Sequence, residues 1–235
     1  MTDKIPVKQI INLLFQYLSP ICTEHGFKPI KSKRCFKLLK NNCEFKLQIV
    51  IKDYYYHEID FSFYVYIRDI AEILVPCLKI HPACVSIKPE QWDNDRHTLA
   101  TALNWFLTGS SAGFCSVYTE EQLLAEMPNI VKNIQQHAFS FFDNYSDLQF
   151  LNKKFNIDFE RGLIFPGLTG EEILTPLVIA KLCNHPNYNE LVETYRPKYL
   201  GLLQGGNPRK EGYKAQIASV YDCLVERLKT VQPLY

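Results

Sequence analysis

Sulfur and imidazole side chains come close together in one stretch of the chain, in the pattern C-x3-H-x2-C. Cys77, His81 and Cys84 form it, and His97 or Cys115 could supply a fourth ligand. Thiolate and imidazole are donors that zinc prefers, and short spacings let a loop surround the ion. The pattern matches no common zinc module, however, and buried free cysteines are the alternative interpretation. We therefore predict no metal and no cofactor.

A second pattern, G-x-S-x-G, places Ser111 between Gly109 and Gly113. In a nucleophile elbow the serine lies on a sharp turn from a strand into a helix. Here a helical pattern comes before the serine and an extended one, 114–118, follows it. The order of elements is reversed, so we interpret the segment as a Gly/Ser turn and assign no catalytic residue.

Imidazole and carboxylate groups meet at the start of one predicted strand, where His57, Glu58 and Asp60 occur. Alternation along a strand places Glu58 and Asp60 on one face and His57 on the other. An enzyme would need these groups to converge with His81 or His97. A dispersed His/carboxylate site is thus one alternative for the function.

A basic run covers residues 28–40, and three tyrosines follow at Tyr54, Tyr55 and Tyr56. Cations beside aromatic rings are typical of single-stranded nucleic-acid binding. Yet the chain carries 26 Lys+Arg against 25 Asp+Glu, which disfavours binding to a phosphate backbone. We favour a solvated hairpin edge as the explanation of the run, because lysines discourage pairing between edge strands. Nucleic-acid association through 28–40 stays as a further alternative.

The elements that position these residues begin with a helix over 7–25, which Gly26 ends in a left-handed conformation. Three alternating runs follow at 33–40, 43–52 and 59–68, and they predict an antiparallel meander with one buried face. The apolar rows of the second and third runs should pack against the first helix. Lys46, Tyr64, Tyr66 and Arg68 belong to the opposite, polar and aromatic face.

Later segments are shorter and mostly helical. A fourth strand is predicted at 84–87, Thr119–Gln122 has the spacing of a capping box, Pro128 could begin a new first turn, and Ser146 could be an N-cap. Helices are predicted at 98–107, 130–142, 148–155, 171–183, 188–203 and 213–231. The fold class is therefore α+β: an antiparallel sheet of about four strands packed on helices, followed by a C-terminal helical bundle. The predicted domains are 1–155 and 156–235.

Aromatic residues make up 13% of the 235-residue chain. Because aromatics with Arg are common interface anchors, we predict a protein partner bound through seven residues of the outer sheet face and its turn: Tyr54, Tyr55, Tyr56, Tyr64, Tyr66, Lys46 and Arg68. The alternative is that the C-terminal helices cover these tyrosines. The N-terminal residues enter an amphipathic helix, not an apolar signal core, and no apolar run is long enough for a membrane span. We expect a cytoplasmic protein with reduced thiols and no membrane contact.

Two segments carry a resemblance to a known family. They are the helix end at 24–28, with its Gly26-Phe27 pair before the meander, and 134–148, with Phe141-Phe142-Asp143. Between Ile10 and Phe155 the chain resembles a bacterial family of domains of unknown function, of the immunity-like kind found in polymorphic toxin systems. The resemblance implies a factor that binds and blocks a partner toxin. It implies no catalytic residues, and the C-terminal helices lie outside it.

Overall fold

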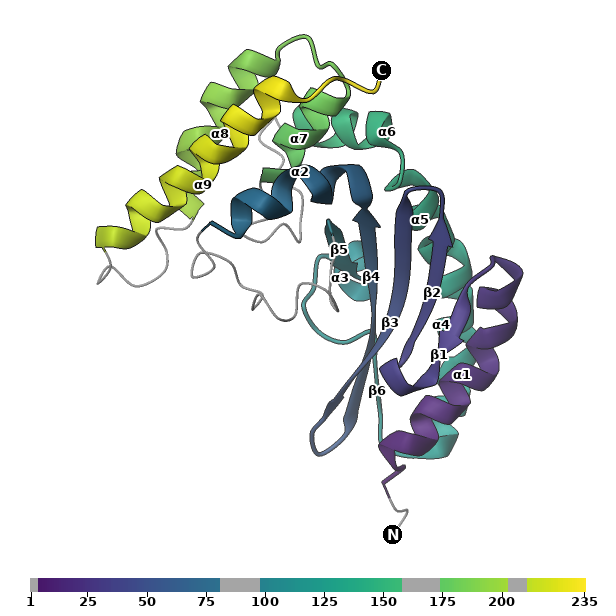
Figure 1. Cartoon of the computed structure of the whole chain (residues 1–235). Helices are drawn as coiled ribbons and strands as arrows, with labels where there is room; N and C mark the ends of the chain where they lie inside the picture. The colour runs from purple at the N-terminus through teal and green to yellow at the C-terminus, as the bar shows by residue number, and fades with distance from the viewer. Residues whose placement is uncertain (1–3, 81–97, 158–173, 203–210) are drawn as a thin grey trace. The chain divides into compact units, whose positions relative to one another are not determined.

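The computed structural model describes residues 4–80, 98–157, 174–202 and 211–235 of the chain (Figure 1). Contacts divide it into two compact units, the first made of 1–65 and 100–144 and the second of 66–99 and 145–235. The predicted α+β class, with a helical C-terminal part, is confirmed. The predicted domains, 1–155 and 156–235, remain a prediction, because a compact unit of contacts need not fold separately.

The sheet has the strand order β1-β2-β3-β4-β5, and β6 also pairs with β4. The three predicted meander strands are β2, β3 and β4. The other strands have only three or four residues, too few for alternation to show, so the sequence indicated about four strands where the sheet has six. Pairing is antiparallel between β1 and β2, β2 and β3, and β4 and β6. The bounds are β1 Lys28–Ile30, β2 Cys35–Lys40, β3 Cys43–Asp53, β4 His57–Ile67, β5 Leu99–Ala102 and β6 Cys115–Val117.

The side-chain period of two holds along both long strands. On β3 the side chains of Phe45, Leu47 and Ile49 are buried while their neighbours are half-buried, and β4 alternates in the same way along its whole length. The two sheet faces therefore differ as predicted: one is core and the other carries polar and aromatic groups. We call the second of these the outer face.

Helices of the first unit lie along the buried face of the sheet (Figure 1). Their bounds are α1 Val7–Glu24, α3 Leu103–Thr108, α4 Glu120–Asn133 and α5 Phe139–Asn144, with a π-helical segment at Ile134–Ala138. The predicted end of the first helix is confirmed, because Gly26 has a φ of +82°. The capping box is also present, with Thr119 and Gln122 each accepting from the other's backbone amide.

An aromatic layer joins the last helix of this unit to the sheet. The ring of Phe142 lies 5.2 Å from that of Phe27, 5.5 Å from Phe45 and 5.7 Å from Phe63, centroid to centroid. Tilted rings at these separations attract beyond the burial of their area. The layer fixes the positions of β3 and β4, whose far ends carry the candidate site.

Three local predictions were wrong. The segment predicted as helix 98–107 begins instead as strand β5, because Leu99 and Thr101 alternate with less buried neighbours, and the helix starts only at Leu103. Pro128 lies inside α4, which continues through it. Asp147, not Ser146, caps the helix that follows. The predicted strand 84–87 lies outside the described residues.

The second unit is helical, apart from the strand ends that enter it. Its helices are α2 Arg68–Leu78, α6 Leu148–Asn152, α7 Thr175–Leu182, α8 Tyr188–Leu202 and α9 Glu211–Thr230, with a π-helical segment at Lys153–Ile157. The helix α2, which the sequence patterns did not indicate, packs against α7 and α9. Tyr195 is buried here, and its hydroxyl lies 3.0 Å from Asn156 Oδ1 and 3.2 Å from the carbonyl of Phe155. Among the described residues, no helix combines the length and apolarity needed to cross a membrane.

Candidate functional site

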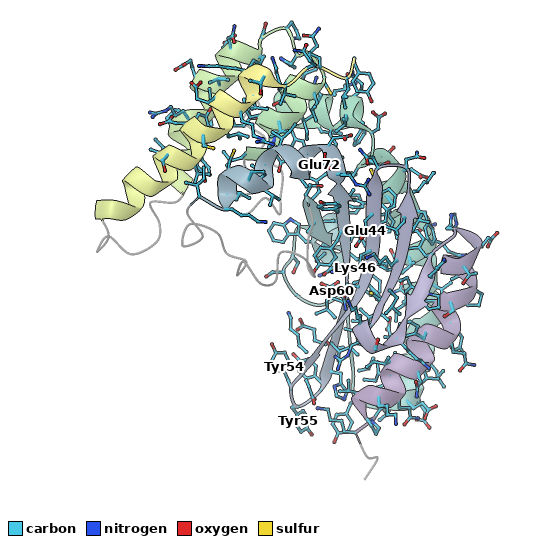
Figure 2. All side chains as sticks on the ribbon, viewed as in Figure 1. Glu44, Lys46, Tyr54, Tyr55, Asp60 and Glu72 are labelled. Atoms are coloured by element: carbon cyan, nitrogen blue, oxygen red, sulfur yellow. The ribbon has the colours of Figure 1, made fainter. Side chains whose placement is uncertain are left out.

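Three consecutive tyrosines form the turn between β3 and β4, and we call Tyr54, Tyr55 and Tyr56 the tyrosine tip. Their exposed fractions are 57%, 83% and 41%. Figure 2 shows Tyr54 and Tyr55 at the far end of the hairpin. Large aromatic side chains that stay this exposed are unusual in a folded chain and mark interaction surfaces when they are contiguous. Within the part of the chain that the structure describes, the three side chains of the tip are therefore exposed.

An ion pair secures the base of the tip. The Lys4 ammonium lies 2.5 Å from Asp53 Oδ1 and also donates to the carbonyl of Tyr54. Its hydrogen bond holds the pKa of Asp53 below the ordinary value, because the cation favours the ionised carboxylate. Within the turn, the amide of Tyr54 donates to the carbonyl of Tyr56 at 2.9 Å. Both the carbonyl and the amide of Tyr54 are therefore hydrogen-bonded, the first to Lys4 and the second to Tyr56.

Beneath the tip, His57 is buried and tied to the N-terminal segment. Its Nε2 lies 2.8 Å from the carbonyl of Ile5, and since a carbonyl can only accept, Nε2 carries the proton. Its Nδ1 is 3.2 Å from Asp53 Oδ1 but has no hydrogen bond. The amide of Ile5 in turn donates to the carbonyl of Tyr118 at 2.9 Å. The ring of Tyr118 lies 5.5 Å from that of Tyr55, so this brace extends to the tip itself.

The outer face behind the tip carries two paired cations. Lys46 Nζ lies 4.3 Å from the centroid of the Tyr64 ring, a cation–π contact between neighbouring strands. Lys52 Nζ lies 2.5 Å from Glu58 Oε1. Asp60 is half-buried, and burial raises its pKa although the amides of Phe61 and Asn104 oppose this by donating to it. Figure 2 shows Lys46 and Asp60 midway along the sheet.

The seven predicted partner-binding residues do not all belong to one unit. Tyr54, Tyr55, Tyr56, Lys46 and Tyr64 lie in the first unit, on the tip or the outer face. Tyr66 is half-buried near the end of β4 and falls in the second unit. Arg68 was predicted to lie on the outer face of the sheet, and this prediction was wrong. The strand ends at Ile67, and Arg68 is the first residue of α2. The candidate site is therefore the tyrosine tip with Lys46 and Tyr64.

The carboxylates and imidazole of the enzyme alternative do not converge in the described structure. Glu58 and Asp60 lie on the outer face and His57 on the buried face, as alternation predicted. Both His81 and His97 lie outside the described residues. Among the described residues 98–157, no histidine contacts Glu58 or Asp60.

The serine pattern forms no nucleophile elbow, and the zinc pattern lies partly outside the described residues. The helix α3 ends before Gly109, and the strand β6 follows, so Ser111 lies in a helix-to-strand loop as predicted. Of the zinc pattern, Cys77 is described and Cys84 is not. The thiol of Cys77 lies 3.2 Å from that of Cys223, a contact that no sequence spacing indicates.

The basic run lies on β1, β2 and the turn between them, and part of its charge is paired. Lys37 Nζ is 2.7 Å from Glu44 Oε1, and Lys40 Nζ is 3.9 Å from Asp143 Oδ1. The strand β2 pairs with residues 43–48 of β3, while the tyrosines follow the other end of that strand. The run therefore lies beside the first half of β3, up to its middle, and the tyrosine tip follows the other end, which weakens the nucleic-acid interpretation that joined them.

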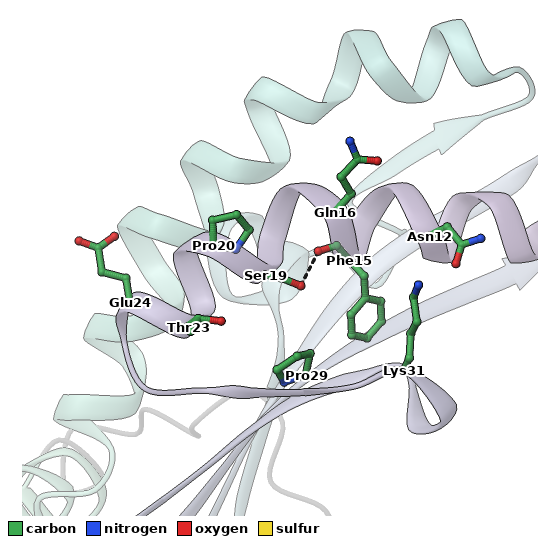
Figure 3. Close-up of a pocket in the computed structure, with 9 residues that line it drawn as sticks. All are labelled: Asn12, Phe15, Gln16, Ser19, Pro20, Thr23, Glu24, Pro29 and Lys31. Atoms are coloured by element: carbon green, nitrogen blue, oxygen red, sulfur yellow. Dashed lines mark hydrogen bonds between the residues drawn. The ribbon is translucent and has the colours of Figure 1, made fainter.

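A groove of about 950 Å³ runs between α1 and the edge strand β1 (Figure 3). Its α1 side is a polar stripe of Asn12, Gln16, Ser19 and Thr23, and the Ser19 hydroxyl donates to the carbonyl of Phe15. Pro29 lies on the opposite side and has no amide proton to offer an incoming strand. The groove is open and shallow, and it holds no cluster of groups that points to a particular ligand.

Sequence patterns missed the residues that brace the tip. Lys4 and Ile5 come from the N-terminal segment and Tyr118 from the residue after β6, and only the fold brings them to the hairpin. One signal was present, since a buried histidine at a strand entrance requires a polar partner. Comparison of the chain with protein-family models, curated proteins and solved structures finds no match.

Proposed function

We propose that this chain is a protein-binding module of the immunity-like kind, which binds a partner protein through the tyrosine tip and blocks it. The observation that supports the proposal most strongly is the tip itself: three adjacent tyrosines are exposed, yet their backbone is fixed by Lys4, Asp53 and the buried His57. Aromatic residues of this type dominate the energy of protein interfaces.

A fixed backbone favours binding because little conformational freedom is left to lose. Ordering a flexible side chain at an interface costs about 0.5–1.5 kcal/mol, and ordering a loop costs more. The amide of Tyr54 already donates to Tyr56, and the ring of Tyr55 rests against Tyr118. A partner that covers the tip therefore gains the burial of Tyr55, which is 83% exposed, at a small entropic cost.

The surroundings of the tip favour a partner recognised by shape and hydrogen bonding. The charges next to the tip are paired, Lys4 with Asp53 and Lys52 with Glu58. Tyrosine hydroxyls supply polar contacts at the rim of an aromatic patch. Lys46 above the Tyr64 ring extends the surface along the outer face. A pocket with apolar walls and hydrogen-bond acceptors on the partner would suit this surface.

The test is an affinity capture of the full chain from a lysate of the organism that encodes it, followed by mass spectrometry. Tyr55→Ala is compared with Tyr17→Ala, because Tyr17 is also an exposed tyrosine (41%) but lies on α1. We expect one stoichiometric protein that the wild type and Tyr17→Ala retain and Tyr55→Ala loses. The captured protein should also lose its own activity when the chain is added in equimolar amount.

Two results would contradict the proposal. One is equal capture by Tyr55→Ala and wild type, which would move the binding surface away from the tip. The other is steep salt-dependent retention of nucleic acid that is lost when the lysines of 28–40 are neutralised, since backbone binding is chiefly electrostatic.

A further inference from the structure

Two cysteines of the second unit approach each other although they are 146 positions apart. Cys77 lies on α2 and Cys223 on α9, and their sulfur atoms are 3.2 Å apart. The two helices pack against each other, so the approach is part of the core of this unit. A disulfide bond is about 2.05 Å long, and the sulfurs therefore need to move by only about 1 Å to form one.

The two thiols differ in access. Cys77 is fully buried, whereas Cys223 is half-buried on the side of α9 that it shares with Arg227, one turn later. Burial raises the pKa of the Cys77 thiol to about 12, and the contact with Cys223 acts in the same direction while the charge of Arg227 opposes it. Cys77 thus stays protonated at neutral pH, and Cys223 is the sulfur that a small reagent reaches first.

Arg227 provides a positive charge at this contact. Its guanidinium donates to the carbonyl of Glu72 on α2 at 3.1 Å, which holds it across the same helix pair. The thiolate is the nucleophile in cysteine chemistry, and the charge of Arg227 opposes, but does not overcome, the effect of burial on the pKa of Cys77. An accessible thiol with a second sulfur within reach is the arrangement that can be oxidised reversibly to a disulfide.

We propose that Cys77 and Cys223 form a redox-active dithiol site, which hydrogen peroxide converts into an intramolecular disulfide. The Cys223 thiolate attacks one peroxide oxygen, the O–O bond breaks, and a sulfenic acid and one water form. The Cys77 sulfur then attacks the sulfenic sulfur, the S–O bond breaks and a second water leaves. Two thiols lose two electrons and two protons in total, and one peroxide is reduced to two waters.

A small peroxide suits this site better than a bulky disulfide such as oxidised glutathione. Thiol–disulfide exchange requires a large reagent to align with the attacking sulfur, and access limits its rate. Cys223 is only half-exposed, between α9 and α2. The product would tie α2 covalently to α9 and restrict the unfolded chain through a long loop, so we expect its melting temperature to rise by about 5–10 °C.

The test treats the folded full-length protein with hydrogen peroxide, blocks remaining thiols with iodoacetamide and maps the cross-linked peptides without reduction. We expect a reversible link between Cys77 and Cys223 that dithiothreitol removes. In Cys77→Ser, dimedone should label Cys223, since the sulfenic acid then has no second sulfur to attack. Cys43→Ser is the matched control, because the Cys43 side chain is also half-buried and carries a thiol, and this variant should keep the link.

The wild-type map alone can overturn the proposal, even if a variant fails to fold. Recovery of Cys77 and Cys223 as separate alkylated peptides, after peroxide treatment that oxidises Cys43, would contradict a dithiol site. A second result would also overturn the proposal. If both thiols resist peroxide and iodoacetamide until a chelator removes bound zinc, the two cysteines belong to a metal site.

Discussion

The aromatic layer of the first unit yields a quantitative prediction, for which the chain offers its own control. Phe142 is 3% exposed and Phe106 is 40% exposed, yet the ring of each lies 5.8 Å from that of Phe141. We compare Phe142→Ala with Phe106→Ala. Both changes remove a phenyl ring from the same neighbour, so the difference between them measures burial and cavity formation.

The expected cost follows from the burial of each ring. Truncating a fully buried phenylalanine costs about 3–5 kcal/mol, which includes the cavity that remains. Phe106 loses only the part of its area that is covered, which at about 1.5–3 kcal/mol for complete burial gives about 1–2 kcal/mol. Phe142→Ala should therefore lower the free energy of unfolding by about 2–3 kcal/mol more than Phe106→Ala.

The assay is urea unfolding followed by tryptophan fluorescence and by circular dichroism, since Trp105 lies in the first unit. With a slope of about 2–3 kcal/mol per molar urea, the midpoint of Phe142→Ala should lie about 1 M below that of Phe106→Ala. Equal midpoints would refute the reasoning, because the ring of Phe142 would then not be a fixed part of the core. A loss below about 1 kcal/mol for Phe142→Ala would refute it too.

Three further predictions concern the site. Asp53 has a lowered pKa, so its bond with Lys4 stabilises the fold above the unfolded-state pKa of 3.8 and is lost as the pH falls below it; Asp53→Asn should flatten this acid limb of the stability profile. Asp60 has a raised pKa, so its ionised form destabilises the fold at higher pH; Asp60→Asn should raise the melting temperature at pH 7 and have less effect at pH 3. Gly113→Ala should cost about 1–3 kcal/mol, because the added Cβ would overlap the side chain of Glu58.

Each of these has a contradicting outcome. An unchanged acid limb in Asp53→Asn would mean that the ion pair at the tip contributes nothing to folding. A lower melting temperature of Asp60→Asn at pH 7 would mean that the carboxylate is stabilised, not strained. Ser111→Ala, in the same exposed loop as Gly113, should change stability by less than about 0.5 kcal/mol, and an equal effect of both variants would remove the role of Glu58.

The sequence predicted those parts of the fold that depend on local rules. The alternation of Phe45, Leu47 and Ile49 predicted the buried face correctly, because a period of two leaves no other arrangement with one dry side. Gly26 marked the end of α1, because only glycine adopts its positive φ freely. The same patterns placed the three tyrosines at the hairpin turn, whereas their exposure is known only from the structure.

The remaining features depend on contacts between distant segments. Lys4 meets Asp53, and Cys77 meets Cys223, only after the chain has folded, and neither spacing carries a local signal. Short elements such as β5 have too few residues for a period to show in the sequence. The burial of Leu99 and Thr101 on one side of β5 becomes visible only in the folded chain. Arg68 illustrates the same limit, because its position continues the alternation of β4 although it is the first residue of α2.

The most direct test of the account is the affinity of the captured partner for purified wild-type chain, Tyr55→Ala and Tyr17→Ala, measured by titration calorimetry. Tyr55 is the most exposed of the three tip residues, so its truncation should cost at least about 2 kcal/mol, or roughly a 30-fold weaker Kd. Tyr17→Ala should bind within about two-fold of wild type, because surface changes away from an interface contribute little. Equal affinities of Tyr55→Ala and wild type, with both proteins folded, would contradict the central claim that the tyrosine tip binds a partner protein.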